Sequence, residues 1–142
     1  MERALLDTDI FSEILRRWNA QIITAAEKYL ATFGRFSLSA VTLAELIDGF
    51  RRRSLDANIA SLLEKLAIDG HSILSFDFES AKVSGRILGD LHRTGQPVGP
   101  ADPMIAATAI VNVLVLVTGN TEHFQRIQAL GYALRIENWR GA

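Results

Sequence analysis

The chain has 142 residues, a length that suits one domain able to bury about two-thirds of its unfolded surface. Hydrophobic residues make up 49% of the chain and charged residues 22%, which excludes long disordered segments. The formal net charge of −1 excludes a general basic field for nucleic acid, and the lack of cysteine excludes disulfides, thiolate zinc sites and cysteine nucleophiles.

Short apolar runs alternate with stretches of helical periodicity along the chain. In chain order, the pattern predicts a strand over residues 4–6, helices over 10–18 and 20–32, a strand over 36–41, helices over 43–53 and 57–68, a strand over 72–76, helices over 78–94 and 104–111, a strand over 113–118, a helix over 122–130 and a strand over 133–136. Glycines that can end a helix follow four of the helices, namely Gly34, Gly70, Gly95 and Gly131.

Strands and helices that alternate at this spacing predict a mainly parallel sheet with helices on both faces, which is a three-layer α/β/α architecture. Residues 113–118 form the most hydrophobic strand, so we place it centrally. The helix over 57–68 carries an apolar stripe, part of which must lie in the core. The stripe consists of Ile59, Leu62, Leu63 and Leu66.

The sequence suggests neither export nor a membrane-spanning segment. The N-terminus has no apolar stretch like that of a signal peptide, and the apolar run 113–117 is far too short to span a bilayer. We therefore expect a soluble, cytoplasmic protein with a single domain over residues 1–142.

Four polar residues lie beside the ends of predicted strands. Asp7 ends the first strand, Glu45 lies just after the second, Asp102 opens the helix before the strand 113–118, and Asn120 follows that strand. The carboxyl ends of parallel strands meet at one edge of a sheet, where open α/β folds bind ligands. We therefore expect these side chains to gather at that edge.

Each of the four residues could instead be a helix cap. Thr42 and Glu45 have the spacing of a capping box, and Asp102 precedes a proline. Asn120 or Thr121 could cap the helix after strand 113–118, and either Asp7 or Asp9 could cap the first helix. Taken singly, capping is the commoner role. Taken together, carboxylates at one edge repel one another unless a cation lies among them, and hard oxygen ligands favour Mg²⁺ or Mn²⁺. Such a centre suits phosphodiester hydrolysis by metal-activated water.

Four segments carry these residues: Leu6-Asp7-Thr8-Asp9, Thr42-Leu43-Ala44-Glu45-Leu46, Asp102-Pro103-Met104-Ile105-Ala106-Ala107 and Val117-Thr118-Gly119-Asn120. Their order and spacing resemble the motifs of the PIN-domain ribonucleases, and among them the VapC-like toxins of bacterial toxin–antitoxin pairs. The resemblance runs from about residue 5 to residue 139, which is nearly the whole chain.

The resemblance implies a PIN-like fold and a metal-dependent endoribonuclease toxin that hydrolyses RNA. It implies a VapB-like antitoxin as the neutralising partner and a homodimer as the assembly. It also implies that Asp7, Glu45 and Asp102 bind Mg²⁺ or Mn²⁺, directly or through water. Asn120 falls at the position where many relatives have a fourth acid. An amphipathic antitoxin segment would bind near the predicted helices 43–53 and 57–68.

The chain departs from the family pattern at one further position. Asp9 stands where the family more often has asparagine, so it adds a negative charge beside the site where Asn120 removes one. The sequence leaves open whether one compensates for the other. Thr8 and Thr118 stand where the family has residues whose hydroxyl groups would orient the carboxylates.

Three consecutive arginines, Arg51, Arg52 and Arg53, end a predicted helix. They could contact RNA phosphates or acids of the antitoxin, as arginine does well. They could equally form a solvated helix end, where cations suit the helix dipole. We expect the three histidines, His71, His92 and His123, to lie on the surface. We expect the two tryptophans, Trp18 and Trp139, to pack against other side chains.

Rival functions fit the sequence less well. A phosphoacceptor domain needs a lysine late in the chain, but the last lysine is Lys82. A nucleotide-binding enzyme needs a glycine-rich first turn, which residues 7–10 lack. A non-catalytic PIN-fold module with a degraded metal site, which binds RNA or protein, is the alternative that stays open.

Overall fold

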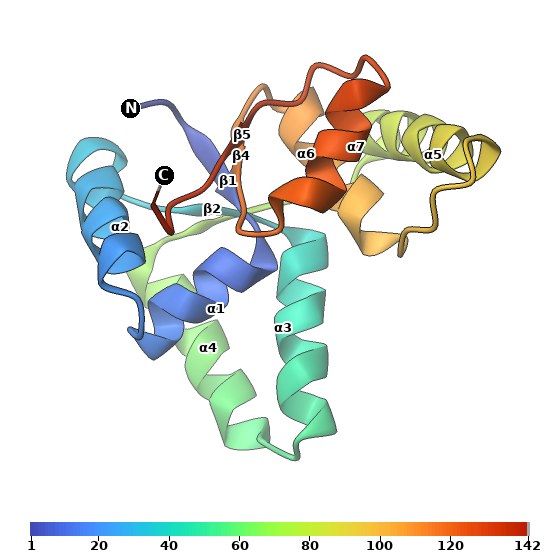
Figure 1. Ribbon diagram of the computed structural model, residues 1–142. Coiled ribbons are helices and arrows are strands. Elements are labelled where there is room, and N and C mark those ends of the chain that lie inside the picture. Colours follow the sequence, from blue (N-terminus) through green and yellow to red (C-terminus); the bar gives the residue numbers. More distant parts are fainter. Residues whose placement is uncertain (142) are drawn as a thin grey trace.

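A parallel sheet of short strands lies at the centre of the fold (Figure 1). The structure is a computed structural model that describes residues 1–141. Its strands are β1 (Ala4–Leu6), β2 (Ser37–Ser39), β3 (Ser72–Leu74), β4 (Val115–Val117) and β5 (Ile136–Glu137). The strand order is β3-β2-β1-β4-β5, and each neighbouring pair is parallel. The predicted parallel sheet is confirmed, although β1 rather than β4 takes the middle position.

Helices cover both faces of the sheet and give the expected three layers. They are α1 (Thr8–Arg16), α2 (Ala20–Phe33), α3 (Ala40–Arg52), α4 (Asp56–Asp69), α5 (Phe78–Arg93), α6 (Ala101–Val111) and α7 (Thr121–Ala129). Ala4 and Leu6 of β1 join the core formed with α1 to α4, whereas Leu5 joins the core formed with α5 to α7. This alternation follows from the two-residue period of a strand.

Local signals place most element ends well. Gly34 and Gly70 end α2 and α4 with left-handed φ angles of 82° and 69°, as predicted for C-terminal caps. Strands β2 to β5 are all shorter than predicted, and local structure explains this for β2 and β4. α3 begins at Ala40 because Ser39 caps it, and β4 begins only at Val115 because exposed Val113 lies in a turn with φ 55°.

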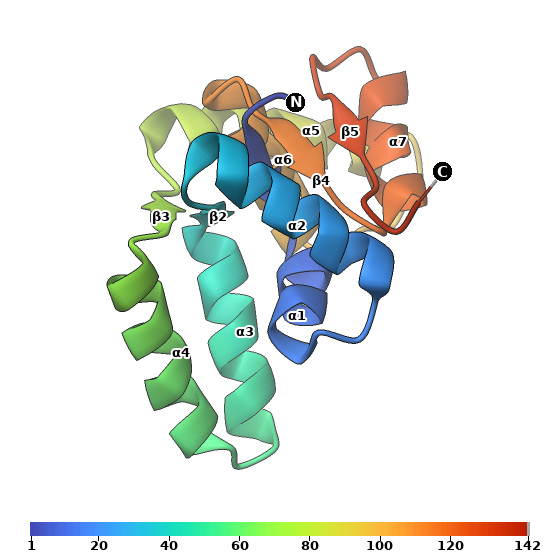
Figure 2. The ribbon, with the colours of Figure 1, turned by 90° about the vertical axis from the view of Figure 1, so that its left-hand side faces the viewer.

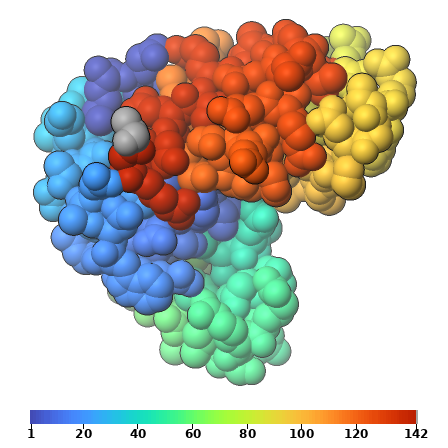
Figure 3. Space-filling model, in the orientation of Figure 1, coloured from blue at the N-terminus to red at the C-terminus, as the bar shows by residue number. Residues whose placement is uncertain are grey.

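The helices α3 and α4 form a hairpin that projects away from the sheet (Figure 2). A hollow separates this hairpin from the arm formed by α5 and its neighbours (Figure 3). The carboxyl end of β1, at Asp7, leads into α1 beside the base of the hairpin. The edge of the sheet that carries the predicted acids therefore opens towards the hollow side of the molecule.

Two predictions about single side chains are wrong. His71 is only 5% exposed at its side chain; its ring stacks on Phe36 with centroids 5.0 Å apart, and its Nδ1 accepts the Phe36 N–H at 3.0 Å. Trp18 is 73% exposed, whereas Trp139 is buried as expected. Over residues 1–141, no helix is both long enough and apolar enough to cross a membrane.

Candidate functional site

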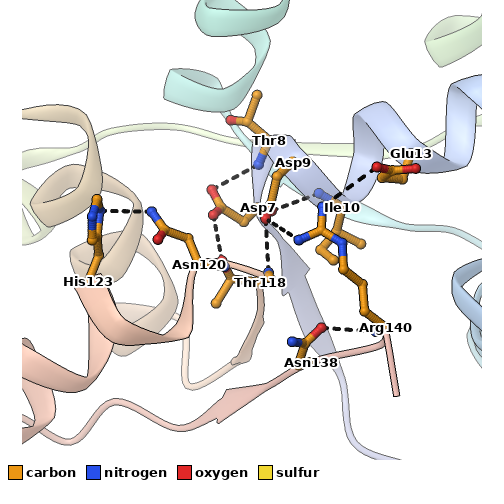
Figure 4. A network of polar contacts seen from close by, with 11 residues as sticks. Asp7, Thr8, Asp9, Ile10, Glu13, Thr118, Asn120, His123, Asn138 and Arg140 are labelled. Atoms are coloured by element: carbon orange, nitrogen blue, oxygen red, sulfur yellow. Dashed lines mark hydrogen bonds and ion pairs between the residues drawn. The ribbon is translucent and has the colours of Figure 1, made fainter. Parts of the chain in front are cut away.

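Asp7 is a buried carboxylate at the junction of β1 and α1 (Figure 4). Its Oδ1 accepts the Thr8 N–H at 2.8 Å, so Asp7 caps α1, and its Oδ2 accepts the Thr118 hydroxyl at 2.8 Å. Burial first, then the charges of Asp9 and Asp102, raise the pKa of Asp7 from 3.8 to about 7, although both hydrogen bonds oppose the shift. Asp7 therefore caps α1, although its surroundings disfavour its ionised form.

Glu45 points to the start of α1 rather than to the start of its own helix. Its Oε1 accepts the Thr8 hydroxyl at 2.5 Å, and that hydroxyl lies 3.1 Å from the Thr42 hydroxyl. The capping box expected between Thr42 and Glu45 is wrong, because Ser39 caps α3 by accepting the Thr42 N–H at 2.9 Å. Capping therefore does not explain why Glu45 is here.

Asp102 and Asn120 meet at His123, on the other side of Asp7. The His123 Nδ1 lies 3.0 Å from Asp102 Oδ2 and 2.8 Å from Asn120 Nδ2. A single ring nitrogen either donates to the carboxylate or accepts from the amide, so the two contacts select different tautomers. Neither Asp102 nor Asn120 caps its helix with its side chain; Pro100 holds the N-cap position of α6.

Asp9 faces the C-terminal segment. Its Oδ1 accepts the Ile10 N–H at 2.7 Å and its Oδ2 the Gly119 N–H at 2.9 Å, while Arg140 Nη1 lies 3.4 Å from Oδ2. A Cβ at position 119 would overlap the Arg140 guanidinium, so this close approach requires glycine. Arg140 thus partly neutralises the extra charge of Asp9, as Figure 4 shows.

The predicted acids lie at one edge of the sheet, but they are not all equally close to one another. Asp102 lies close enough to Asp7 for its charge to raise the pKa of Asp7. Among residues 1–141, no three acidic or histidine side chains are grouped closely enough to hold one metal ion as they stand. The role of Glu45 as a third ligand therefore stays a prediction.

The three consecutive arginines have different surroundings. Arg51 Nη1 pairs with Asp56 Oδ2 at 2.6 Å, and Arg52 Nε pairs with Asp48 Oδ2 at 3.2 Å. The Arg53 guanidinium instead lies over the Phe50 ring, 5.7 Å from its centroid. Only for Arg51 and Arg52 does a local helix-end ion pair account for the charge.

Sequence reasoning missed two residues of the site, His123 and Arg140. His123 lies three residues after Asn120 at the start of α7, a spacing that places two side chains on one helix face and could have indicated the contact. Arg140 lies 131 residues after Asp9, so no local pattern indicates their pairing.

The chain is similar to known proteins over nearly its whole length. The family model described as PIN domain matches residues 4–130. The chain is 32% identical to the tRNA(fMet)-specific endonuclease VapC of Shigella flexneri, over 98% of this chain and 99% of that one. It is 35% identical to the enzyme of the same name from Salmonella typhimurium, over 80% and 82%. The crystal structure of DNA-bound VapBC from Salmonella typhimurium superimposes with a TM-score of 0.80 at 32% identity, covering 98% of this chain and 99% of that one.

Proposed function

The chain belongs to the PIN-domain family, and on that premise we propose that it is an endoribonuclease toxin neutralised by a cognate antitoxin. We propose further that cleavage depends on Mg²⁺ or Mn²⁺. We also propose a cytoplasmic location and a homodimer that forms through another face than the one that binds the antitoxin.

The observation that carries the proposal is the buried carboxylate of Asp7. Burial and two further acids, Asp9 and Asp102, oppose the charge of Asp7, which costs stability when no cation is bound. A divalent cation beside Asp7 and Asp102 would relieve that opposition. The unfavourable charge of Asp7 therefore favours a cation site over the alternative that these residues serve only as helix caps.

The donor set fits a hard cation. Mg²⁺ commonly keeps several of its waters and is held by one or two carboxylates, which matches the pair of Asp7 and Asp102. When bound, such an ion supplies an activated water and neutralises charge on the phosphate. Thr118 holds the Asp7 carboxylate in place, and Thr8 holds Glu45, so both carboxylates are oriented by hydroxyl groups.

Cleavage of purified tRNA(fMet) and of total RNA tests this function, because two relatives carry that tRNA in their names. We expect cleavage with Mn²⁺ or Mg²⁺, none with EDTA, and none by Asp102→Asn with either metal. RNA that is bound but never cleaved, with any of these metals, would instead establish the non-catalytic module.

The antitoxin needs an apolar surface, and an apolar recess lies between α1, α2 and the end of α4. Its volume is about 490 Å³, and its walls are the side chains Phe11, Ile14, Ile23, Ala26, Leu30 and Phe36. Charged groups from α2 and α4, Glu27 and Lys65 among them, form the rim. Leu62 and Leu66 of the predicted stripe are core residues, so the antitoxin surface is better placed here than along that stripe.

Ile23→Glu should weaken binding of the antitoxin, taken as the product of the adjacent reading frame, at least tenfold, because it places a charge in this recess. RNA cleavage by the free protein should not change. Ala31→Glu, on an exposed face of the same helix, is the matched control. Equal affinities of the two variants in a titration would place the antitoxin elsewhere.

A further inference from the structure

A second recess lies directly beside the acids, between α1 and the α3–α4 hairpin. Its volume is about 330 Å³. Thr8 and Glu45, which are hydrogen-bonded to each other, line its end at the acid cluster, and Asn58 lines the far end. We call this recess the hairpin cleft. It is continuous with the candidate site through Thr8 and Glu45.

The wall of the hairpin cleft is apolar and its rim is cationic. Leu15, Leu46 and Phe50 provide the apolar surface, and Arg16 and Arg53 provide the charge. The Arg53 guanidinium lies over the Phe50 ring, and Arg16 lies 4.9 Å from the centroid of the exposed Trp18 ring. Within residues 1–141, neither guanidinium lies within 4.0 Å of a carboxylate oxygen, unlike those of Arg51 and Arg52.

The size of the hairpin cleft limits what it can hold. A volume of 330 Å³ is at the small end of pockets for organic ligands, which suits a single nucleoside. An amphipathic helix, about 10–12 Å across, needs a longer groove. The Arg53 Nε donates to the Gly49 carbonyl at 3.3 Å, but neither the Arg53 nor the Arg16 charge is paired with a carboxylate among residues 1–141. Two such cations on a chain with a net charge of −1 favour a phosphorylated ligand.

We propose that the hairpin cleft is the subsite for one nucleotide of the RNA, next to the scissile phosphodiester bond. The proposal rests on the proposed function and adds the place where the substrate is recognised. The base packs against Phe50 and its apolar neighbours, because every base has a face that can stack on an aromatic ring. Arg53 and Arg16 hold phosphate oxygens, which arginine can contact with two N–H groups at once.

Two polar side chains inside the hairpin cleft can distinguish bases. Ser12 and Asn58 line it, and an amide and a hydroxyl can each donate to and accept from a base edge. Single-stranded RNA offers such edges because its bases are unstacked. The base at this subsite should therefore influence which phosphodiester bond is cleaved.

The test compares Arg53→Met with Arg52→Met. Both changes remove a guanidinium at the end of α3, but only Arg53 lines the hairpin cleft. We expect Arg53→Met to raise the KM for RNA cleavage about tenfold, the scale of one lost charge-assisted hydrogen bond, with kcat changed less than about threefold. Arg52→Met should leave both constants unchanged, and melting temperatures should show that both variants fold.

Binding of a fluorescent single-stranded RNA measures the same subsite without cleavage. In the Asp102→Asn background, Arg53→Met should lower the dependence of log affinity on log salt by about 0.7, the value for one lost phosphate contact. Asn58→Ala, an exposed change, should alter the ranking of oligonucleotides that differ at one base.

Unchanged KM and salt dependence in Arg53→Met would overturn the subsite while leaving the nuclease intact. Loss of antitoxin affinity in Arg53→Met with normal RNA binding would overturn it in favour of an antitoxin contact. If the wild-type protein cleaves no RNA, the proposed function fails. Weaker oligonucleotide binding by Arg53→Met would still support the subsite, whereas no binding by either protein would overturn it.

Discussion

Asp7→Asn should abolish RNA cleavage and leave the metal-free protein at least as stable as the wild type. Removing a residue that orients a metal ligand already costs about 10–100-fold in activity, so removing a ligand itself should cost more than about 100-fold. Asparagine keeps an acceptor for the Thr8 N–H and offers the Thr118 hydroxyl an N–H in exchange. The fold therefore loses a strained charge but no hydrogen bond.

Melting curves with and without Mn²⁺ separate the two roles of Asp7. Wild-type protein should gain about 2.7 kcal/mol when the metal is present at 100 times its Kd, and Asp7→Asn should lose most of that gain. Asp77→Asn is the matched control, because Asp77 caps α5 by accepting the Ser80 N–H at 2.9 Å and lies outside the site. A mutant that is destabilised by about 0.5–2 kcal/mol yet responds fully to Mn²⁺ would identify Asp7 as a helix cap alone.

The stability of the metal-free protein should fall as the pH rises through the range set by Asp7. Its pKa is raised from 3.8 to about 7 by burial and by Asp9 and Asp102, so the folded state binds this proton more tightly than the unfolded state. Below about pH 4 both states hold the proton and the cost is absent. Between about pH 4 and 7 the cost grows, and above pH 7 it is complete, at about 1–4 kcal/mol.

His71 acts in the opposite direction, so wild type alone cannot report on Asp7. Burial lowers the pKa of His71 below 6.5, which means that its contribution to stability is present above pH 6.5 and is lost as the pH falls. Its protonation also breaks the bond from the Phe36 N–H to Nδ1. The contribution of His71 is the same in Asp7→Asn and wild type, so it cancels in the difference between their free energies of unfolding.

Urea unfolding at pH 5 and pH 8 measures that difference. The advantage of Asp7→Asn over wild type should be larger at pH 8 than at pH 5, and Asp77→Asn should show no such change. A difference that is independent of pH would mean that Asp7 titrates alike in the folded and unfolded protein. The raised pKa, and with it the argument for a cation site, would then be wrong.

The charge balance around Asp7 is arranged by residues that lie far apart in the sequence. Arg140 and the Gly119 N–H take up the charge of Asp9, and the second nitrogen of the Arg140 guanidinium lies 3.7 Å from Glu13 Oε1. Asn120 contacts His123 instead. Asp9 is therefore held towards the C-terminal segment, which does not favour the idea that it replaces a missing acid at position 120.

The order of the elements, and the edge of the sheet where polar residues gather, follow from local patterns in the sequence. Strand and helix periods are local, because side chains alternate every two residues in a strand and recur about every 3.6 in a helix. Glycine ends helices such as α2 through its own backbone freedom. A polar residue just after a buried strand, such as Asp7, has to lie at the carboxyl edge once the strands are parallel.

The partners of these side chains depend on tertiary packing and could not be predicted from local patterns. The signals for a capping box at Thr42–Glu45 and an N-cap at Asp102 were local, and both failed because α3 and α6 begin earlier, at Ala40 and Ala101. Glu45 bonds to Thr8, 37 positions away, since β1 and β2 are neighbours in the sheet. Contacts of this kind depend on how helices pack on a sheet, and no short-range pattern carries that information.

Tertiary packing also explains why three consecutive arginines have different surroundings. Arg51, Arg52 and Arg53 are equivalent in sequence, but a helix turns about 100° per residue, so consecutive side chains face different surroundings. Arg51 and Arg52 pair with acids on α4 and α3, while Arg53 lines the hairpin cleft. Packing of α1 against the α3–α4 hairpin creates that cleft, and residues of α1, α3 and the start of α4 have to meet before it exists.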